Sequence, residues 1–306
     1  SSSIKSGWNP VYTRSGFYEY KNEEWTNFNA YTNSTLDSLL DISVVKAIPN
    51  ENKILFGAHY FGLFEFSTND NSFKIIKYPP SENREFRLTG ADADQYGNVW
   101  MSNAYSSNAP LVCRKSNGDY VYFKNGFISG TNKLLKDVLV DDYNQIWIAK
   151  SDNIGGITVL NYGNDIDDQS DDQYFNLTAN GLGNLPTNNI TCLAKDKDGI
   201  IWLGSTQGIA IISCAGYVAD NACEAEQICI DRKDGSGFCD NLLEDEIINC
   251  ITVDAGNRKW IGTNNGIFLV SADGTKTIHY FNENNSPLLS NFINCITINP
   301  DNDDVF

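Results

Sequence analysis

The sequence is poor in the residues on which many enzyme active sites depend. It holds two histidines, His59 and His279, and a single methionine in 306 residues. It has no Gly-x-Ser-x-Gly elbow, no phosphate-binding loop and no paired histidines at metal-ligand spacing. We therefore expect no catalytic residue, no metal and no cofactor, although 39 acidic residues leave an acid–base carboxylate pair open.

Basic residues and long apolar runs are also scarce. Lys and Arg number 22 against 39 Asp and Glu, a net charge of −17, and no basic stripe interleaved with aromatics occurs, so a nucleic-acid partner is not expected. No run of about 18 apolar residues predicts a transmembrane segment. The longest acidic stretch, 165–172, lacks the Gly and Glu of an EF-hand and predicts a solvated loop rather than a calcium site.

What the chain does have is a recurrent motif with Asp six residues before Trp. It occurs four times, at Asp94–Trp100, Asp141–Trp147, Asp196–Trp202 and Asp254–Trp260. Phe56 and Phe306 stand in weaker copies, and successive anchors lie 44, 47, 55, 58 and 46 residues apart (56→100→147→202→260→306). A period near 50 residues predicts an array of like structural units.

One unit, residues 189–212, shows the expected local fold. The apolar run 190–194 predicts a strand, 195–199 a hairpin turn and 200–204 a second strand. A second turn and a third strand follow at 205–208 and 209–212. Most units continue with a more polar, aromatic fourth strand, at 73–78, 120–123, 174–177 and 277–281.

Radially repeated, four-stranded antiparallel units are the blades of a β-propeller, so the predicted fold class is all-β. We expect each Trp to fill the space between neighbouring blades. We expect each Asp to accept hydrogen bonds from the N–H groups of its turn. Four carboxylates converging on a binding site are the alternative, but their recurrence once per unit favours the structural role.

The two ends of the chain are complementary. The N-terminal copy supplies strands three and four (16–20 and 24–30), and the C-terminal copy supplies strand one (293–298) and the start of strand two. Six blades, closed by both termini into one domain over 1–306, would leave no exposed edge. Seven blades are the alternative, because Trp8 also resembles an anchor. The start without Met and the stop inside a strand suggest a piece of a larger multidomain protein that continues past Phe306.

The eight cysteines include two distinct groups. Cys192, Cys250 and Cys295 share one position in strand one and are expected to be small buried packing residues, with a three-thiolate metal site as the alternative. Four others, Cys214, Cys223, Cys229 and Cys239, belong to an irregular insertion at 214–246. Without a C-x-x-C pair zinc is not expected there. A disulfide is plausible in a secreted protein, but its pairing is open.

The pattern Asp-x-x-Gly-x-x-Trp-x-Gly-Thr-x-x-Gly-Ile, best matched at Asp196–Ile209 and Asp254–Ile267, resembles the two-component regulator propeller repeat. Residues 255–267 and 280–291 also resemble the PorZ proteins of the Bacteroidetes type IX secretion system. That resemblance implies a surface-exposed propeller that helps deliver anionic lipopolysaccharide and is not an enzyme. It also implies an extracytoplasmic location, in the periplasm or at the outer-membrane surface.

Three classes of function follow. The first is a non-catalytic binding module of a surface or secretion-linked protein, with a glycan, lipopolysaccharide or secretion-system protein as partner. The second is the periplasmic sensor propeller of a hybrid two-component system. The third is an enzyme such as a propeller polysaccharide lyase or a glycosidase.

A ligand site, if the chain has one, is expected at the turns between strands two and three, near the mouth of the central channel. These turns mix amides with aromatics, which suits hydrogen bonding and stacking on sugars. Ordinary hairpin chemistry explains the same residues equally simply. The candidate ligand-binding residues are His59, Tyr60, Asn103, Tyr105, Lys150, Asp152, Gln207, Asn264 and Asn265.

Overall fold

The computed structural model describes residues 11–21, 23–58, 62–76, 87–106, 109–124, 135–151, 154–299 and 302–306. Nearly all regular structure in these residues is antiparallel β-sheet, with short 3-10 turns at η1 (Ser34–Ser38) and η3 (Ala215–Asp220). The chain forms two compact units, 1–138 and 139–306. None of the described helices is long and apolar enough to cross a membrane.

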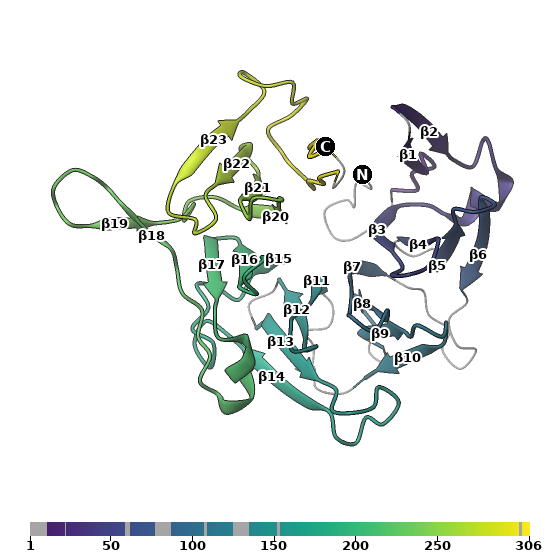
Figure 1. Ribbon diagram of the computed structural model, residues 1–306, viewed down its shortest axis with the longest axis horizontal. Helices are drawn as coiled ribbons and strands as arrows, with labels where there is room; N and C mark the ends of the chain where they lie inside the picture. The colour runs from purple at the N-terminus through teal and green to yellow at the C-terminus, as the bar shows by residue number, and fades with distance from the viewer. Residues whose placement is uncertain are drawn as a thin grey trace. The chain divides into compact units, whose positions relative to one another are not determined.

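The first unit contains a two-stranded hairpin and two four-stranded sheets (Figure 1). The hairpin pairs β1 (Phe17–Lys21) with β2 (Glu24–Phe28). One sheet has the order β3-β4-β5-β6, with bounds Ile42–Ala47, Lys53–Ala58, Gly62–Ser67 and Ser72–Ile76. The other has the order β7-β8-β9-β10, with bounds Leu88–Ala93, Val99–Asn103, Leu111–Arg114 and Tyr120–Phe123.

The second unit repeats the same plan. Its first sheet starts with β11 (Leu135–Val140), a strand that runs across the division between residues 138 and 139, and continues with β12 (Ile146–Lys150), β13 (Gly156–Asn161) and β14 (Gln173–Leu177). A three-stranded sheet follows, made of β15 (Ile190–Lys195), β16 (Ile201–Ser205) and β17 (Gly208–Ile212). The last sheet has the order β20-β21-β22-β23, with bounds Ile248–Val253, Lys259–Thr263, Ile267–Val270 and Thr277–Phe281.

The predicted all-β fold of four-stranded antiparallel blades is confirmed. The fourth strands match closely, with β10 and β23 at the predicted 120–123 and 277–281. The predicted strand 293–298 is wrong: within the described residues it is reduced to a bridge between Ile298 and Val305, flanked by backbone hydrogen bonds between Thr297 and Phe306. Six blades, ring closure by the termini and a single domain remain predictions.

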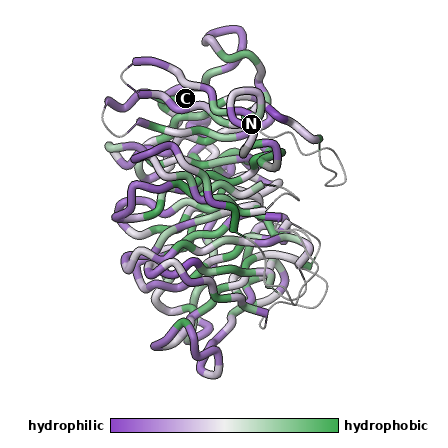
Figure 2. Tube along the Cα trace, turned by 90° about the vertical axis from the view of Figure 1, so that its right-hand side faces the viewer, coloured by the Kyte–Doolittle hydropathy of each residue, from purple (hydrophilic) through white to green (hydrophobic). Residues whose placement is uncertain are grey.

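Polar residues lie in the turns of the sheets and apolar residues in the strands. In Figure 2 hydrophilic residues gather at the loop ends and hydrophobic residues along the strands between them. The central strands β8, β12 and β16 are buried over their whole length, while the outer strands are half exposed. Burial of a strand on both faces is typical of the inner strands of propeller blades.

Trp147 and Trp202 lie between neighbouring sheets, as predicted. Trp147 on β12 packs in one cluster with Ile201 and Leu203 of β16. Trp202 on β16 packs with Ile248 and Ile261 of the next sheet. Each is at most 1% exposed, as is Trp100. The indole rings of Trp147 and Trp202 are therefore wedges that fix adjacent sheets of their unit against each other.

The assignment of Phe56 as an anchor is wrong by one residue. The strand pairing places Gly57 opposite Val44, as Gly204 lies opposite Cys192, so Leu55 occupies the position of Trp202. Leu55 packs toward the following sheet with Leu88 and Val99. Phe56 points to the opposite face, against Phe17 and Phe28 of the β1–β2 hairpin. A shift of one residue exchanges the two faces of a strand, which explains the error.

The cysteine predictions hold in part. Cys192 is buried and Cys250 half-buried, and each sulfur lies where a side chain on Gly204 or Gly262 would collide with it. The prediction of burial is wrong for Cys295, which is exposed next to the incomplete last strand pair. In the insertion, Cys214 bonds to Cys223 and Cys229 to Cys239.

Candidate functional site

At the turn between strands one and two, each motif aspartate organises its own hairpin. Asp141 shows the pattern: Oδ1 accepts the backbone N–H groups of Tyr143 (2.9 Å) and Gln145 (2.8 Å), and Oδ2 accepts the indole Nε1–H of Trp147 (2.8 Å). Asp94 and Asp196 repeat all three bonds. Acceptance of turn N–H groups was predicted. The bond to the indole, which fixes the ring in its wedge, was not.

A further donor to the same carboxylate differs from sheet to sheet. Asn98 and Gln145 donate their side-chain amides to Asp94 and Asp141, at 2.8 and 2.9 Å. Asp196 instead receives the ammonium of Lys259 (2.9 Å), which comes from β21 of the next sheet and lies over the Trp202 ring at 4.4 Å from its centroid. Both side chains are at most 1% exposed, so this is a buried ion pair that joins two sheets.

Burial raises the pKa of Asp196, but the bonds from Lys259, Trp202 and the Ile200 N–H outweigh it, so its pKa lies below the ordinary value. The same two effects act on Asp254. Burial raises its pKa, but the hydrogen bonds from Arg258 and Trp260 lower it more, so its pKa also lies below the ordinary value. All four carboxylates are buried and hydrogen-bonded to their own hairpins, and Asp196 is also bonded to Lys259 of the next sheet. They are a structural latch and are not aimed at a ligand.

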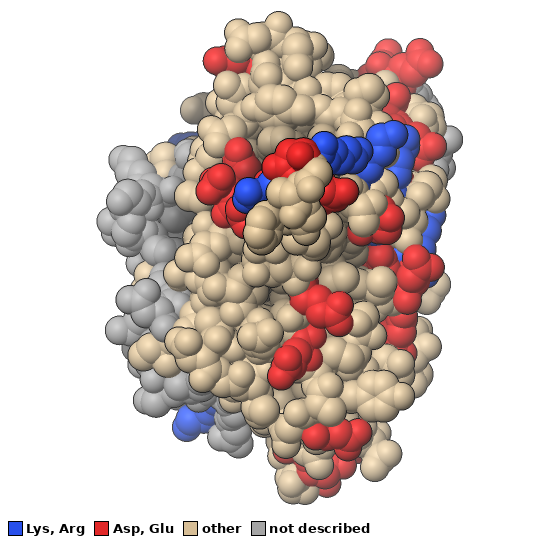
Figure 3. Space-filling view, turned by 90° about the vertical axis from the view of Figure 1, so that its left-hand side faces the viewer, with Lys and Arg blue, Asp and Glu red and all other residues tan. Residues whose placement is uncertain are grey.

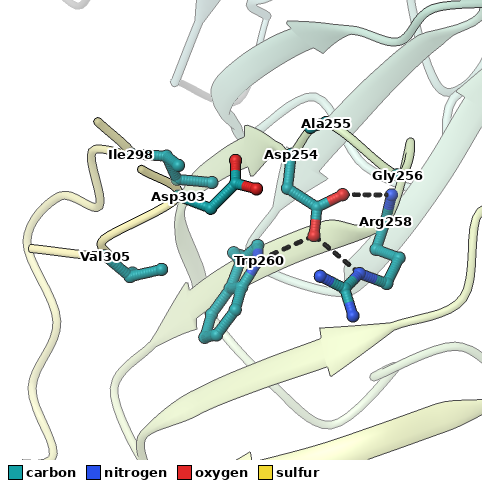
Figure 4. Close-up of a pocket in the computed structure, with 8 residues that line it drawn as sticks. All are labelled: Asp254, Ala255, Gly256, Arg258, Trp260, Ile298, Asp303 and Val305. Carbon is teal, nitrogen blue, oxygen red and sulfur yellow. Dashed lines mark hydrogen bonds and ion pairs between the residues drawn. The ribbon is translucent and has the colours of Figure 1, made fainter. Parts of the chain in front are cut away.

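The latch of Asp254 borders a small pocket (Figure 4). Asp254 accepts Arg258 Nε (2.6 Å) and Trp260 Nε1 (3.2 Å), and Ile298, Asp303 and Val305 form the opposite wall. Its volume is about 40 Å³. That is room for one or two waters and not for a sugar ring.

The predicted ligand residues lie at the other turns, between strands two and three. Three of them, His59, Tyr60 and Asp152, fall outside the described residues. Asn103 is fully buried and holds its own loop: its Nδ2 donates to the Ala109 carbonyl (3.1 Å) and its Oδ1 accepts the Arg87 N–H (2.8 Å). Its side chain therefore shapes the loop and does not present a group to solvent.

Lys150 is also fully buried. Its ammonium donates to Thr158 Oγ1 at 2.7 Å and to Asn176 Oδ1 at 3.4 Å, across three strands of one sheet. Tyr105 in the first unit is half-buried, has a backbone φ of 62°, and carries the Arg87 guanidinium 5.0 Å from its ring centroid. Of Asn103, Lys150 and Tyr105, only Tyr105 has part of its side chain at the surface.

In the second unit, Gln207, Asn264 and Asn265 are brought together by a segment that the sequence analysis missed. Glu246, at the end of the insertion, accepts Asn265 Nδ2 through both oxygens (2.9 and 3.2 Å). Its backbone carbonyl accepts the N–H of Gly208, next to Gln207 (3.1 Å). Asn249 Nδ2 donates to Asn264 Oδ1 (3.0 Å). These five residues, Gln207, Glu246, Asn249, Asn264 and Asn265, are called the amide cluster below.

The amide cluster offers polar groups to solvent. Gln207 and Asn265 are exposed, and Glu246, Asn249 and Asn264 are half-buried. Tyr280, 39% exposed, donates its hydroxyl to the Asn265 carbonyl (2.6 Å) and stacks on Phe268. No local motif signals Glu246, because it follows an irregular insertion and meets Asn265 across 19 residues.

The described residues offer no group of three or more His, Cys, Asp and Glu placed to hold a metal ion. The acidic stretch 165–172 forms turns in which Asp165 and Asp168 accept N–H groups two residues ahead. His279, expected at the surface of an outer strand, is exposed on β23. On the face seen in Figure 3, acidic side chains form several separate groups and are more widespread than basic ones.

Comparison with known proteins agrees with this architecture. Residues 184–207 match the family model described as two component regulator propeller. No curated protein matches the sequence. PorZ, a surface component of the type IX secretion system of Porphyromonas gingivalis, has a TM-score of 0.77 at 20% identity, over 94% of this chain and 42% of PorZ. The chain thus spans less than half the length of PorZ.

Two further structures are similar in fold. Virginiamycin B lyase from Staphylococcus aureus has a TM-score of 0.58 at 13% identity, over 84% of this chain and 73% of the lyase. The extracellular domain of a putative one component system from B. thetaiotaomicron has a TM-score of 0.50 at 15% identity, over 87% of this chain and 37% of that domain. The chain is thus an all-β propeller that carries a two-component regulator propeller repeat and resembles PorZ in fold.

Proposed function

We propose that the chain is a non-catalytic binding module of an extracytoplasmic, secretion-linked or surface protein, and that the amide cluster contacts a glycan. The observation that carries this proposal is the meeting of Gln207, Glu246 and Asn265 from three separate segments at one exposed place. The Asn265 amide and the Glu246 carboxylate fix one another, and Gln207 beside them is exposed. Amide and carboxylate groups donate and accept hydrogen bonds as sugar hydroxyls require. Tyr280 beside them adds an aromatic surface.

The two disulfides support an extracytoplasmic location, because such bonds persist in oxidising compartments. PorZ is a bacterial surface component, and the fold of this chain is similar over 94% of its length. The sensor alternative draws on the two-component regulator propeller repeat at 184–207 and on the extracellular domain of a putative one component system, which is similar in fold. The amide cluster is the proposed contact surface under either function.

The lyase alternative rests on the similar fold of virginiamycin B lyase, one structure of which is a catalytically inactive variant with a histidine replaced by alanine. In this chain the described histidine, His279, lies on the outer strand β23, with its ring 5.6 Å from that of Phe281. His59 falls outside the described residues. The test of the lyase alternative is therefore turnover of the bound ligand.

Binding of the purified chain to a glycan array, followed by titration calorimetry with the best ligand, tests the proposal. We expect Asn265→Ala and Gln207→Ala each to weaken binding about tenfold, since a lost hydrogen bond in a site costs about 1–1.5 kcal/mol. Asp220→Ala, at an exposed position on η3, is the matched control and should bind as the parent does. Binding that survives both amide substitutions would reject this surface, and turnover of the bound glycan would reject the non-catalytic assignment.

A further inference from the structure

The insertion between β17 and β20 ends in a hairpin that differs from every blade. β18 (Cys229–Asp231) and β19 (Cys239–Asn241) are three residues long, and the Cys229–Cys239 disulfide joins the first residue of one strand to the first residue of the other. The nine residues from 231 to 239 are all exposed. In Figure 1 the loop projects outward from the sheets of its unit.

The hydrogen bonds of this loop join its own residues. Arg232 pairs with Asp240, and Asp231 and Asp234 accept the N–H groups of Lys233 and Ser236. A Cβ built on Gly235 or on Gly237 would meet no atom within 4 Å. Phe238 is 68% exposed. Nothing in the described structure therefore covers this segment, although the disulfide fixes its two ends.

Two consecutive basic residues, Arg followed by Lys, occur at three places in the sequence, and the loop carries the pair in which both residues are exposed. Of the other two pairs, 114–115 includes Arg114, which is 2% exposed and bound to Glu65, and 258–259 includes the fully buried Lys259. At 232–233 both residues are exposed. The ammonium of Lys233 has no hydrogen-bond or ion-pair partner among the described residues, whereas Arg232 is held by Asp240.

We propose that the Lys233–Asp234 bond is a processing site for a lysine-specific or trypsin-like endopeptidase. Such proteases need an exposed basic side chain in a segment that can enter their cleft without unfolding the domain, and loop tips meet this need. In the cleavage the water oxygen bonds to the Lys233 carbonyl carbon, the C–N bond breaks, and the protons of water end on the new carboxyl and amino termini.

The Cys229–Cys239 disulfide spans the cut, with one cysteine on each side of it. The part that ends at Lys233 and the part that begins at Asp234 therefore remain covalently joined. Cleavage opens the loop that presents Phe238 and leaves the blades intact, because β17 and β20 lie outside the disulfide ring. The modification changes one exposed surface without dismantling the fold.

Limited digestion with endoproteinase Lys-C and with trypsin tests the proposal, with the products separated with and without reductant. We expect a first cut after Lys233 that shows as one band without reductant and as two fragments with it. Lys233→Gln should abolish that first cut by Lys-C. Lys276→Gln, at an exposed position in the β22–β23 turn, is the control and should be cut as the parent is.

The double substitution Cys229→Ser and Cys239→Ser should leave the cut in place but give two fragments without reductant. Mass spectrometry of the fragments identifies the bond. A first cut at any other lysine, or resistance of the 229–241 hairpin while other sites are cut, would overturn the proposal.

Discussion

Equivalent sheet-to-sheet contacts in the two units are built from different chemistry. In the second unit, the contact between β15–β17 and β20–β23 holds Asp196, Trp202 and the buried Lys259 in one hydrogen-bonded group. In the first unit, the contact between β3–β6 and β7–β10 has Ile48 and Leu55 at the corresponding positions, 2% and 1% exposed.

Charge reappears in the first unit at a different place. Arg114 of β9 bonds to Glu65 of β5 (3.0 Å) and to Glu51 (2.9 Å), so the ion pairs join the third strands and a turn instead of the motif position. The comparison shows that the space between two neighbouring sheets must be filled, but that different residues can fill it. The Asp–Trp motif fills this space and also fixes the turn through hydrogen bonds to the aspartate.

The largest effect is expected for Asp196→Ala. The substitution leaves the Lys259 ammonium buried without its carboxylate and frees the indole N–H of Trp202. Breaking a buried ion pair costs about 3–5 kcal/mol. Chemical denaturation measures the loss, and Asp220→Ala on the surface should change the free energy of unfolding by less than about 0.5 kcal/mol. Equal losses for the two variants would refute the latch.

Leu55→Ala should cost about 3 kcal/mol, because it opens a cavity in a packed apolar contact. Since no polar group is orphaned, the loss should fall below that of Asp196→Ala. Denaturant titration of the two variants side by side measures the difference. A larger loss for Leu55→Ala would mean that apolar packing, and not the hydrogen-bonded latch, carries more of the sheet contact.

The two disulfides should differ in the same experiment. Cys223 is 3% exposed in the core cluster of its unit, so Cys214→Ser with Cys223→Ser should lower the free energy of unfolding by about 2 kcal/mol. The Cys229–Cys239 pair closes an exposed hairpin, and its removal should cost less than about 0.5 kcal/mol. Similar losses would show that the hairpin is packed on the blades.

The smallest effect is expected from acid. The pKa of Asp254 lies below its ordinary value of 3.8 in the folded chain, so its stabilising contribution is complete above that pH. The contribution is lost as pH falls through the lower, folded pKa. Asp254→Asn should therefore flatten the decline of Tm below about pH 4. If the decline of Tm with falling pH were the same in Asp254→Asn, the ionised Asp254 carboxylate would not contribute to stability.

Much of the blade could be predicted because its signals are local. The Asp-Gly turns, the strand alternation and the Trp spacing placed β15 to β17 and β23 within a residue or two. The Phe56 error arose because the turn before Leu55 is one residue longer than in the Trp-bearing copies and carries no Asp. Register, which decides which face is buried, depends on the partner strand.

The candidate site was harder to predict than the fold. Asn103 and Lys150 looked like exposed turn residues, yet both are buried at the last position of their strands and bond to neighbouring strands or loops. Glu246 could be identified as a candidate only from the structure, in which the end of the insertion contacts the turns that hold Gly208 and Asn265. Tertiary contacts of this kind leave no pattern in the sequence.

Hydrogen exchange of the indole N–H groups, followed by NMR with 15N-labelled tryptophan, tests the central claim most directly. We predict slow exchange for Trp100, Trp147, Trp202 and Trp260, whose Nε1–H groups are bonded to motif aspartates. Trp25, 56% exposed on β2, should exchange rapidly. If the four motif indoles exchanged as fast as Trp25, they would not be wedges latched between blades.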